Sequence, residues 1–343
     1  MPRWLPATGR VAHVDVGRGL LITWMVTAHA LTLAAIPDQH WMQALRPRAW
    51  ATTGFVMLTG YTLALIQLRR PTLTPGFAGL LWKRAMKLAI VAYVSNAASE
   101  TIISATSGGF DAAHLLDALL LRTPWTISGI LVPTTIVVAL APALVLLARR
   151  LNPVAMLAVA VAANIILEAD VTVPFTNVTL RAAAAARGPF SFPVFDFVAG
   201  SCGAFALGAV VARVRPAFSP WTVPVAVASA VLVLAAVPLS APGPFAVKTV
   251  RFVITLGLAG IMVAIPVLGP LRAGLQVLGR AALLAFVAHR PALHLARLAL
   301  GGRLSREALA LALMASVMTL CIGLAVAKQR SARVAGLLAH AAM

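Results

Sequence analysis

The chain has 343 residues, of which 61% are hydrophobic and 11% are charged, and its formal net charge is +19. A soluble domain carries about 25% charged residues, and a disordered chain has low hydrophobicity, so both classes are excluded. The composition predicts an all-α polytopic membrane protein. In that class a large positive charge indicates Lys and Arg at the cytoplasmic ends of membrane helices rather than a nucleic acid partner.

Ten segments are predicted to cross the membrane, because a span needs roughly 20 mainly apolar residues. Together they predict one integral-membrane domain over residues 1–343, a bundle of about ten helices with both termini in the cytoplasm. The segments lie near residues 14–36, 50–68, 84–106, 128–148, 153–169, 193–213, 221–239, 250–269, 275–298 and 305–327.

The first segment holds three ionisable residues, Asp15, Arg18 and His29. Intramembrane ionisable residues are costly and are candidates for function. Asp15 and Arg18 are three residues apart and share a helix face. Arg18 and His29 are eleven residues apart, close to three turns, which places them on one face about 16 Å apart along the axis. Equally open at this point is a structural interpretation, with Arg18 as an interfacial anchor and His29 as a packed hydrogen-bonding group.

Basic residues gather where the second segment ends and the third begins. Arg84 and Lys87 are three residues apart, and Arg69 and Arg70 precede them. A cluster of this kind beside Arg18 could bind a phosphorylated compound, since guanidinium and ammonium groups pair strongly with phosphate. For Arg69 and Arg70 we favour the alternative, that they only follow the positive-inside rule.

The segment 111–122 is apolar but short, and it carries Asp111, His114 and Asp117. We interpret it as a surface or re-entrant piece, because two carboxylates facing lipid would be costly. If the chain crosses the membrane ten times from a cytoplasmic N-terminus, more Lys and Arg residues lie on the cytoplasmic side than on the outer side. The alternative, in which 111–122 spans, would invert every helix that follows.

The later segments add three candidate residues. Asp196 lies near the outer end of 193–213, and His289 and His294 lie in 275–298. The spacing of five between the two histidines does not suit a metal pair on one helix face, so no metal site is predicted. Cys202 and Cys321 lie in apolar runs without zinc or disulfide spacing, and we interpret both as small core residues.

Several short patterns, taken in order, resemble the membrane-integral acyltransferase 3 superfamily. Arg18 and His29 form its Arg-x10-His pattern, the run 55–61 is similar to its second-helix stretch, and Arg84 with Lys87 looks like its Arg-x-x-Arg motif. The run 278–291 resembles a late stretch that ends in His. The nearest likeness is to the OpgC type, which succinylates osmoregulated periplasmic glucans. The features of that likeness are Asp15, Arg18 and Gly19, the run 59–62, the run 130–133, Pro193 and Gly200.

The resemblance implies an O-acyltransferase of a bacterial inner membrane. It would take an acyl group from cytoplasmic acyl-CoA, either acetyl-CoA or succinyl-CoA, and pass it to a hydroxyl of an extracytoplasmic glycan or lipid-linked sugar. Arg18, Arg84 and Lys87 would then hold the CoA phosphates. The resemblance further implies His29 as general base or acyl carrier, Asp15 as the group that orients Arg18, and Asp196 as a contact to the acceptor, with His289 a further outer-side candidate.

Two other functions remain open from the residues alone. A transporter or flippase would share the composition, the spans and the buried charges, although we see no related halves of the kind that transporters show. A diverged, non-catalytic membrane partner would fit the departures from the family pattern, such as Lys87 in place of Arg and Ala282 in place of Ser.

Overall fold

The computed structural model describes residues 11–42, 50–70, 72–106, 112–113, 116, 128–168, 192–213 and 244–330. Within these residues the chain is all-α, as predicted, and no strand occurs. The helices are α1 (Ala12–Leu33), α2 (Trp50–Arg69), α3 (Phe77–Thr106), α5 (Ser128–Arg150), α6 (Pro153–Glu168), α8 (Phe192–Arg213), α10 (Pro244–Ala264), α11 (Gly269–Arg280), α12 (Ala282–Leu300) and α13 (Arg306–Arg330), with a 3-10 turn η2 (Pro266–Leu268).

Five of the described helices, namely α1, α2, α5, α12 and α13, are long and apolar enough to cross a membrane. Shorter apolar stretches lie in α6, α8 and α10. The predicted segments at 14–36, 50–68, 128–148, 153–169, 193–213 and 305–327 match helices to within a few residues. The count of ten spans stays a prediction, because 221–239 and most of 107–127 lie outside the described residues.

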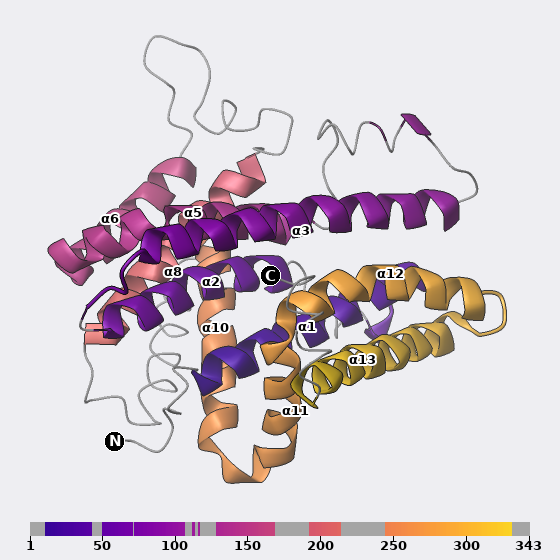
Figure 1. The fold of residues 1–343 in the computed structure, drawn as a ribbon. Helices are drawn as coiled ribbons and strands as arrows, with labels where there is room; N and C mark the ends of the chain where they lie inside the picture. The colour runs from indigo at the N-terminus through magenta and orange to yellow at the C-terminus, as the bar shows by residue number, and fades with distance from the viewer. Residues whose placement is uncertain are drawn as a thin grey trace.

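α1 and α2 lie in the middle of the described helices (Figure 1). α2 packs closely on α8, and α1 packs on α2, α10, α11, α12 and α13. The α2–α8 contact is close because small residues face each other: Gly60 lies against the backbone of Ser201, whose hydroxyl donates to the Val56 carbonyl at 2.7 Å. Close approach through small residues is how membrane helices associate.

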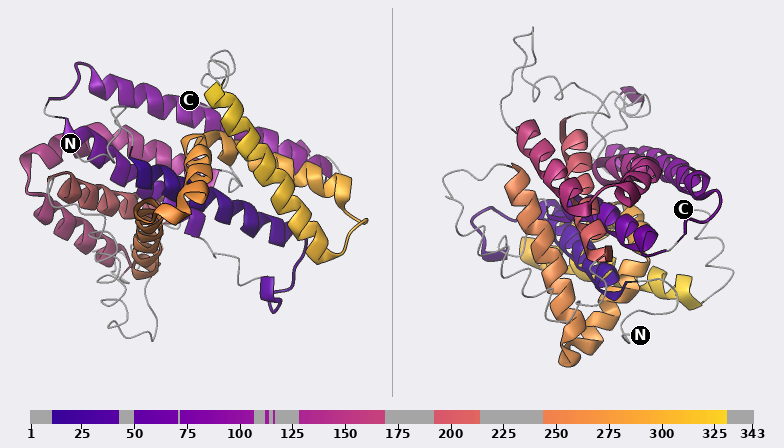
Figure 2. Two further views of the ribbon diagram at one scale, coloured as in Figure 1. Left: turned by 90° about the horizontal axis from the view of Figure 1, so that it is seen from below. Right: turned by 90° about the vertical axis from the view of Figure 1, so that its left-hand side faces the viewer.

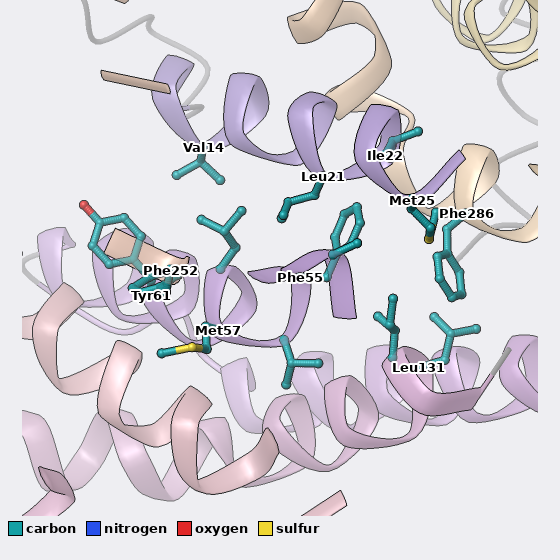
Figure 3. Close-up of a cluster of buried hydrophobic side chains, with 14 of the residues drawn as sticks. Val14, Leu21, Ile22, Met25, Phe55, Met57, Tyr61, Leu131, Phe252 and Phe286 are labelled. Carbon is teal, nitrogen blue, oxygen red and sulfur yellow. The ribbon is translucent and has the colours of Figure 1, made fainter. Parts of the chain in front are cut away.

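An apolar core fills the space between α1, α2, α5, α10 and α12. Figure 3 shows large side chains from these helices meeting there, among them Leu21, Phe55, Leu131, Phe252 and Phe286. Phe55 and Phe286 meet edge to face, with ring centroids 6.3 Å apart. This core holds α1 and α12 side by side, which matters for the histidines described below.

Arginine side chains cap the ends of neighbouring helices. Arg149 of α5 donates to the carbonyls of Gln67 and Arg70 at the end of α2, at 3.2 and 2.7 Å. Arg213 of α8 donates to Ala148 near the end of α5 at 2.7 Å. The last turns of α2, α5 and α8 therefore lie together. The predicted surface segment 111–122 lies for the most part outside the described residues, and its placement stays a prediction.

Two features differ from a simple bundle of antiparallel spans. α10 runs steeply across α2, on which it packs (Figure 1), and its steep course is seen again in the right-hand view of Figure 2, whereas apolarity alone fixes no tilt. The predicted continuous segment 275–298 is divided at Ala281, where α11 ends and α12 begins in a new direction. Gly279 and Arg280 directly precede Ala281, but the prediction treated the segment as continuous through them.

Candidate active site

α1 carries Asp15, Arg18 and His29 on one uninterrupted helix, as the sequence predicted. Asp15 is buried, whereas Arg18 and His29 are half-buried. The eleven residues between Arg18 and His29 correspond to about 16 Å along the axis. α1 therefore joins two positions, a guanidinium toward its beginning and an imidazole toward its end.

The imidazole of His29 stacks on that of His289 from α12. Their ring centroids are 5.3 Å apart, and the ring planes are inclined by 27°. Phe286, one turn before His289 on α12, lies against His289 with a centroid distance of 5.6 Å. The structure thus brings the strongest and one of the weaker candidates of the sequence into direct contact.

Hydrogen bonding fixes the tautomer of His289. Its Nδ1 lies against the carbonyl oxygen of Phe286, and because a carbonyl only accepts, Nδ1 must carry the proton. In the neutral ring Nε2 then holds a lone pair. The side chain is 1% exposed, and no group among the described residues hydrogen-bonds Nε2. A buried polar atom without a partner is costly, at about 1–3 kcal/mol, and such groups often mark sites of chemistry.

Asp15 pairs with Arg280 at the end of α11. The Arg280 Nε to Asp15 Oδ2 distance is 3.6 Å. Two glycines let the helices approach this closely: Gly19 lies against the Leu275 carbonyl, and Gly279 lies against the Asp15 carbonyl, so that a Cβ at either position would overlap the opposite backbone. Arg280 was not a site candidate in the sequence. The proposed action of Asp15 on Arg18 stays a prediction.

Arg84 and Lys87 lie exposed on α3. α3 packs on α5 and α12, and it makes no substantial contact with α1 among the described residues. Whether Arg84 and Lys87 lie beside Arg18 stays a prediction. Asp196 lies in the second turn of α8, and its side chain is outside the part of the structure that is described. Roles for all three stay predictions.

A family model that describes an acyltransferase domain, that of the acyltransferase 3 family, matches residues 11–328. The chain belongs to the acyltransferase 3 family. The match takes in the stacked histidines, the Asp15–Arg280 pair and the apolar helices, and the family makes this chain a membrane protein of acyltransferase type. No curated protein and no solved structure matches the chain significantly.

Sequence reasoning missed one further pair in this acyltransferase. His13 of α1 lies with its Nε2 3.3 Å from the hydroxyl of Tyr61 on α2. Tyr61 also meets Phe252 of α10 edge to face, at 6.1 Å between centroids. His13 lies more than four turns before His29, at the opposite end of α1. The only available signal was the polarity of His13 within an apolar helix, which does not indicate a partner.

Proposed function

We propose that this acyltransferase moves an acyl group from a cytoplasmic acyl-CoA to a hydroxyl of an extracytoplasmic glycan or lipid-linked sugar, in a bacterial inner membrane. The observation that carries the proposal is the stack of His29 on His289, with a buried imidazole lone pair beside it, inside a domain of an acyltransferase family.

The stacked histidines supply what acyl transfer to a hydroxyl requires. The hydroxyl oxygen attacks the carbonyl carbon of the thioester, and His29 takes the hydroxyl proton as general base. The C–S bond then breaks, the ester is formed, and the proton on His29 passes to the departing CoA thiolate. General base catalysis of this kind contributes about 10²–10⁴-fold to a rate.

His289 supports this step through its fixed tautomer. With Nδ1–H held by the Phe286 carbonyl, Nε2 can only accept a hydrogen bond. It is therefore suited to hold a hydroxyl of the acceptor next to His29. The stack also limits the orientations of the His29 ring, so that the base is held in position before the acceptor arrives.

The donor would bind at the end of α1 that carries Arg18. CoA phosphates pair with guanidinium groups, often through two parallel hydrogen bonds. Arg18 is half-buried on the helix that leads to His29, which suits a donor that enters from one side and delivers its thioester at depth. Arg84 and Lys87 are exposed cations on α3 and would add attraction for the phosphates. The donor would be acetyl-CoA or succinyl-CoA.

The test uses the full chain reconstituted in lipid vesicles with radiolabelled acetyl-CoA or succinyl-CoA. Consumption of the thioester with release of free CoA thiol supports the proposal, and a transporter or a non-catalytic partner gives none. Retention on a CoA affinity resin is a second measurement, and Arg18→Ala and Arg84→Ala should each weaken it. Intact thioester from both donors with properly folded protein would overturn the proposal.

A further inference from the structure

The buried face of α3 changes from apolar to polar along the helix. Its first half buries the apolar residues Leu81, Ala85, Leu88 and Ala92. Its second half buries the polar residues Ser95, Asn96, Ser99, Glu100 and Ser104. The exposed side of α3 carries large apolar residues such as Trp82, Met86, Ile90, Tyr93 and Val94. In a membrane protein the apolar side faces lipid, so the polar groups of the second half face the protein interior.

Asn96, Ser99 and Glu100 have the spacing of one helix face, since positions three and four apart are neighbours. Their exposed fractions are 2%, 1% and 6%. Polar and ionisable groups placed inward at membrane depth are expensive and usually mark a substrate path or a binding site. The first half of the helix, by contrast, packs through apolar side chains.

α12 contributes a cation to the same region. α3 packs on α12, and the Glu100 carboxylate lies within electrostatic range of Arg290 and His294 on that helix. Arg290 directly follows His289. Among the described residues no group hydrogen-bonds the buried Nη1 of Arg290 or the buried hydroxyl of Ser99. Nε2 of His289 is a third such atom, so three buried polar atoms on α3 and α12 lack a hydrogen-bond partner among the described residues.

The chemistry of this group of side chains selects a class of ligand. Arg290 and the amide of Asn96 donate, Glu100 and Nε2 of His289 accept, and Ser99 can do both. Each hydroxyl of a sugar is also donor and acceptor, so a polyhydroxyl compound can bond both to the donor Nη1 of Arg290 and to the acceptor Nε2 of His289. An anionic ligand would pair with Arg290 but would be repelled by Glu100, which lies near it.

We propose that Asn96, Ser99 and Glu100 of α3, together with Arg290 of α12, bind an uncharged sugar unit of the acceptor and direct one of its hydroxyls to the stacked histidines. We call these four residues the α3–α12 polar face. This inference rests on the proposed function, because it assigns the acceptor side of the same reaction.

The experiment measures sugar binding by saturation-transfer difference NMR on the purified full chain. The probes are maltoheptaose, an uncharged glucose oligosaccharide, and succinate, an anion without hydroxyl groups. Maltoheptaose should show saturation transfer with the wild type, and its affinity should fall about tenfold in Glu100→Gln and in Arg290→Gln, the loss expected for a hydrogen bond to a charged group. Thr101→Ala is the matched control, since Thr101 is exposed and its hydroxyl bonds to Ala97 of its own helix.

Ser99→Ala keeps the test decisive if the charge variants fold poorly. It removes a hydroxyl that has no hydrogen-bond partner among the described residues and so should not disturb folding, yet it should weaken maltoheptaose binding severalfold. Unchanged affinity in folded Ser99→Ala and Glu100→Gln would overturn the assignment, as would a wild type that binds succinate and not the sugar.

Thioester hydrolysis, measured without acceptor in the same samples, separates the two proposals. Hydrolysis without sugar binding means that the α3–α12 assignment fails while the proposed function stands. Sugar binding that depends on the polar face, without any hydrolysis of acetyl-CoA or succinyl-CoA, means that the proposed function fails while the sugar site stands.

Discussion

His29 and His289 stand at opposite ends of the sequence, yet their rings stack with centroids 5.3 Å apart. The contact exists because α12 lies along α1, held by a shared apolar core that includes Phe55 and Phe286. It places an imidazole whose proton position is fixed against the residue that we propose as the base.

Replacing His289 by Asn separates chemistry from packing. The Asn amide nitrogen can still donate to the Phe286 carbonyl, but it supplies no group at the position of Nε2. We expect His289→Asn to fold normally and to transfer acyl groups at least about tenfold more slowly, as for loss of a positioned acid–base or hydrogen-bonding group. Acyl transfer in lipid vesicles measures this. His40→Ala, which removes a histidine paired with Glu307 at 3.5 Å, is the control. Wild-type rates in His289→Asn would remove His289 from the site.

The contact of α1 with α11 predicts a strong effect of a single methyl group. In Gly279→Ala the new Cβ would overlap the Asp15 carbonyl, so the helices must separate. Overpacking costs about 1–3 kcal/mol, and we expect a lower melting temperature in detergent together with lower activity. Gly274→Ala lies on the same helix with open space around its Cβ, and it should be neutral or slightly stabilising because Ala favours helix. Equal melting temperatures would contradict the close approach of α1 and α11.

The Asp15–Arg280 pair predicts a coupled pair of variants. The Arg280 side chain is 39% exposed and the Asp15 side chain 10%, so the pair is intermediate between surface and buried ion pairs. Loss of one partner should therefore cost roughly 1–3 kcal/mol, between the values for those two classes. Arg280→Leu and Asp15→Asn should each lower stability, and the double variant should lose less than the sum of the two. Additive losses in a double-mutant cycle would show that the pair contributes no coupling.

Arg149 and Arg150 offer a direct comparison of capping with charge. Arg149 donates to two carbonyls at the end of α2, whereas Arg150 is exposed. Both changes to Gln remove one positive charge from the same end of the molecule. We expect Arg149→Gln to lower thermal stability, by about 1–3 kcal/mol for hydrogen bonds from a charged group, and Arg150→Gln to have little effect. A similar loss in both variants would mean that charge, not capping, is what matters at this end.

Much of the helical framework could be predicted from the sequence, because long apolar segments leave few alternatives to a membrane helix. The bounds of α1, α2 and α5 follow from apolarity and from the basic residues that end α2 and α5. Proline often breaks a helix, yet Pro133 and Pro142 lie inside α5 without ending it. The apolar run that joins Arg18 to His29 was equally informative about the site, since it predicted that both residues lie on one helix.

The remaining features depend on contacts between helices, which no local pattern contains. From the sequence His289 was one of the weaker site candidates, because nothing in the residues of α12 indicates that His289 meets His29 of α1. The ion pair of Asp15 was expected with Arg18, its neighbour on the helix face. In the structure Asp15 pairs with Arg280, which comes from α11, the helix that ends before Ala281. The polar face of α3 went unnoticed because its residues are spread through an otherwise apolar segment and become a cluster only when α12 packs on α3.

The central claim, that His29 is the base of acyl transfer, is tested most directly by single-turnover transfer from radiolabelled acyl-CoA in vesicles that contain wild type or His29→Ala. We predict that His29→Ala inserts and folds normally, still binds the CoA resin, and transfers about 10²–10⁴-fold more slowly, while His40→Ala transfers normally. A folded His29→Ala protein that transfers the label at the wild-type rate would contradict the account.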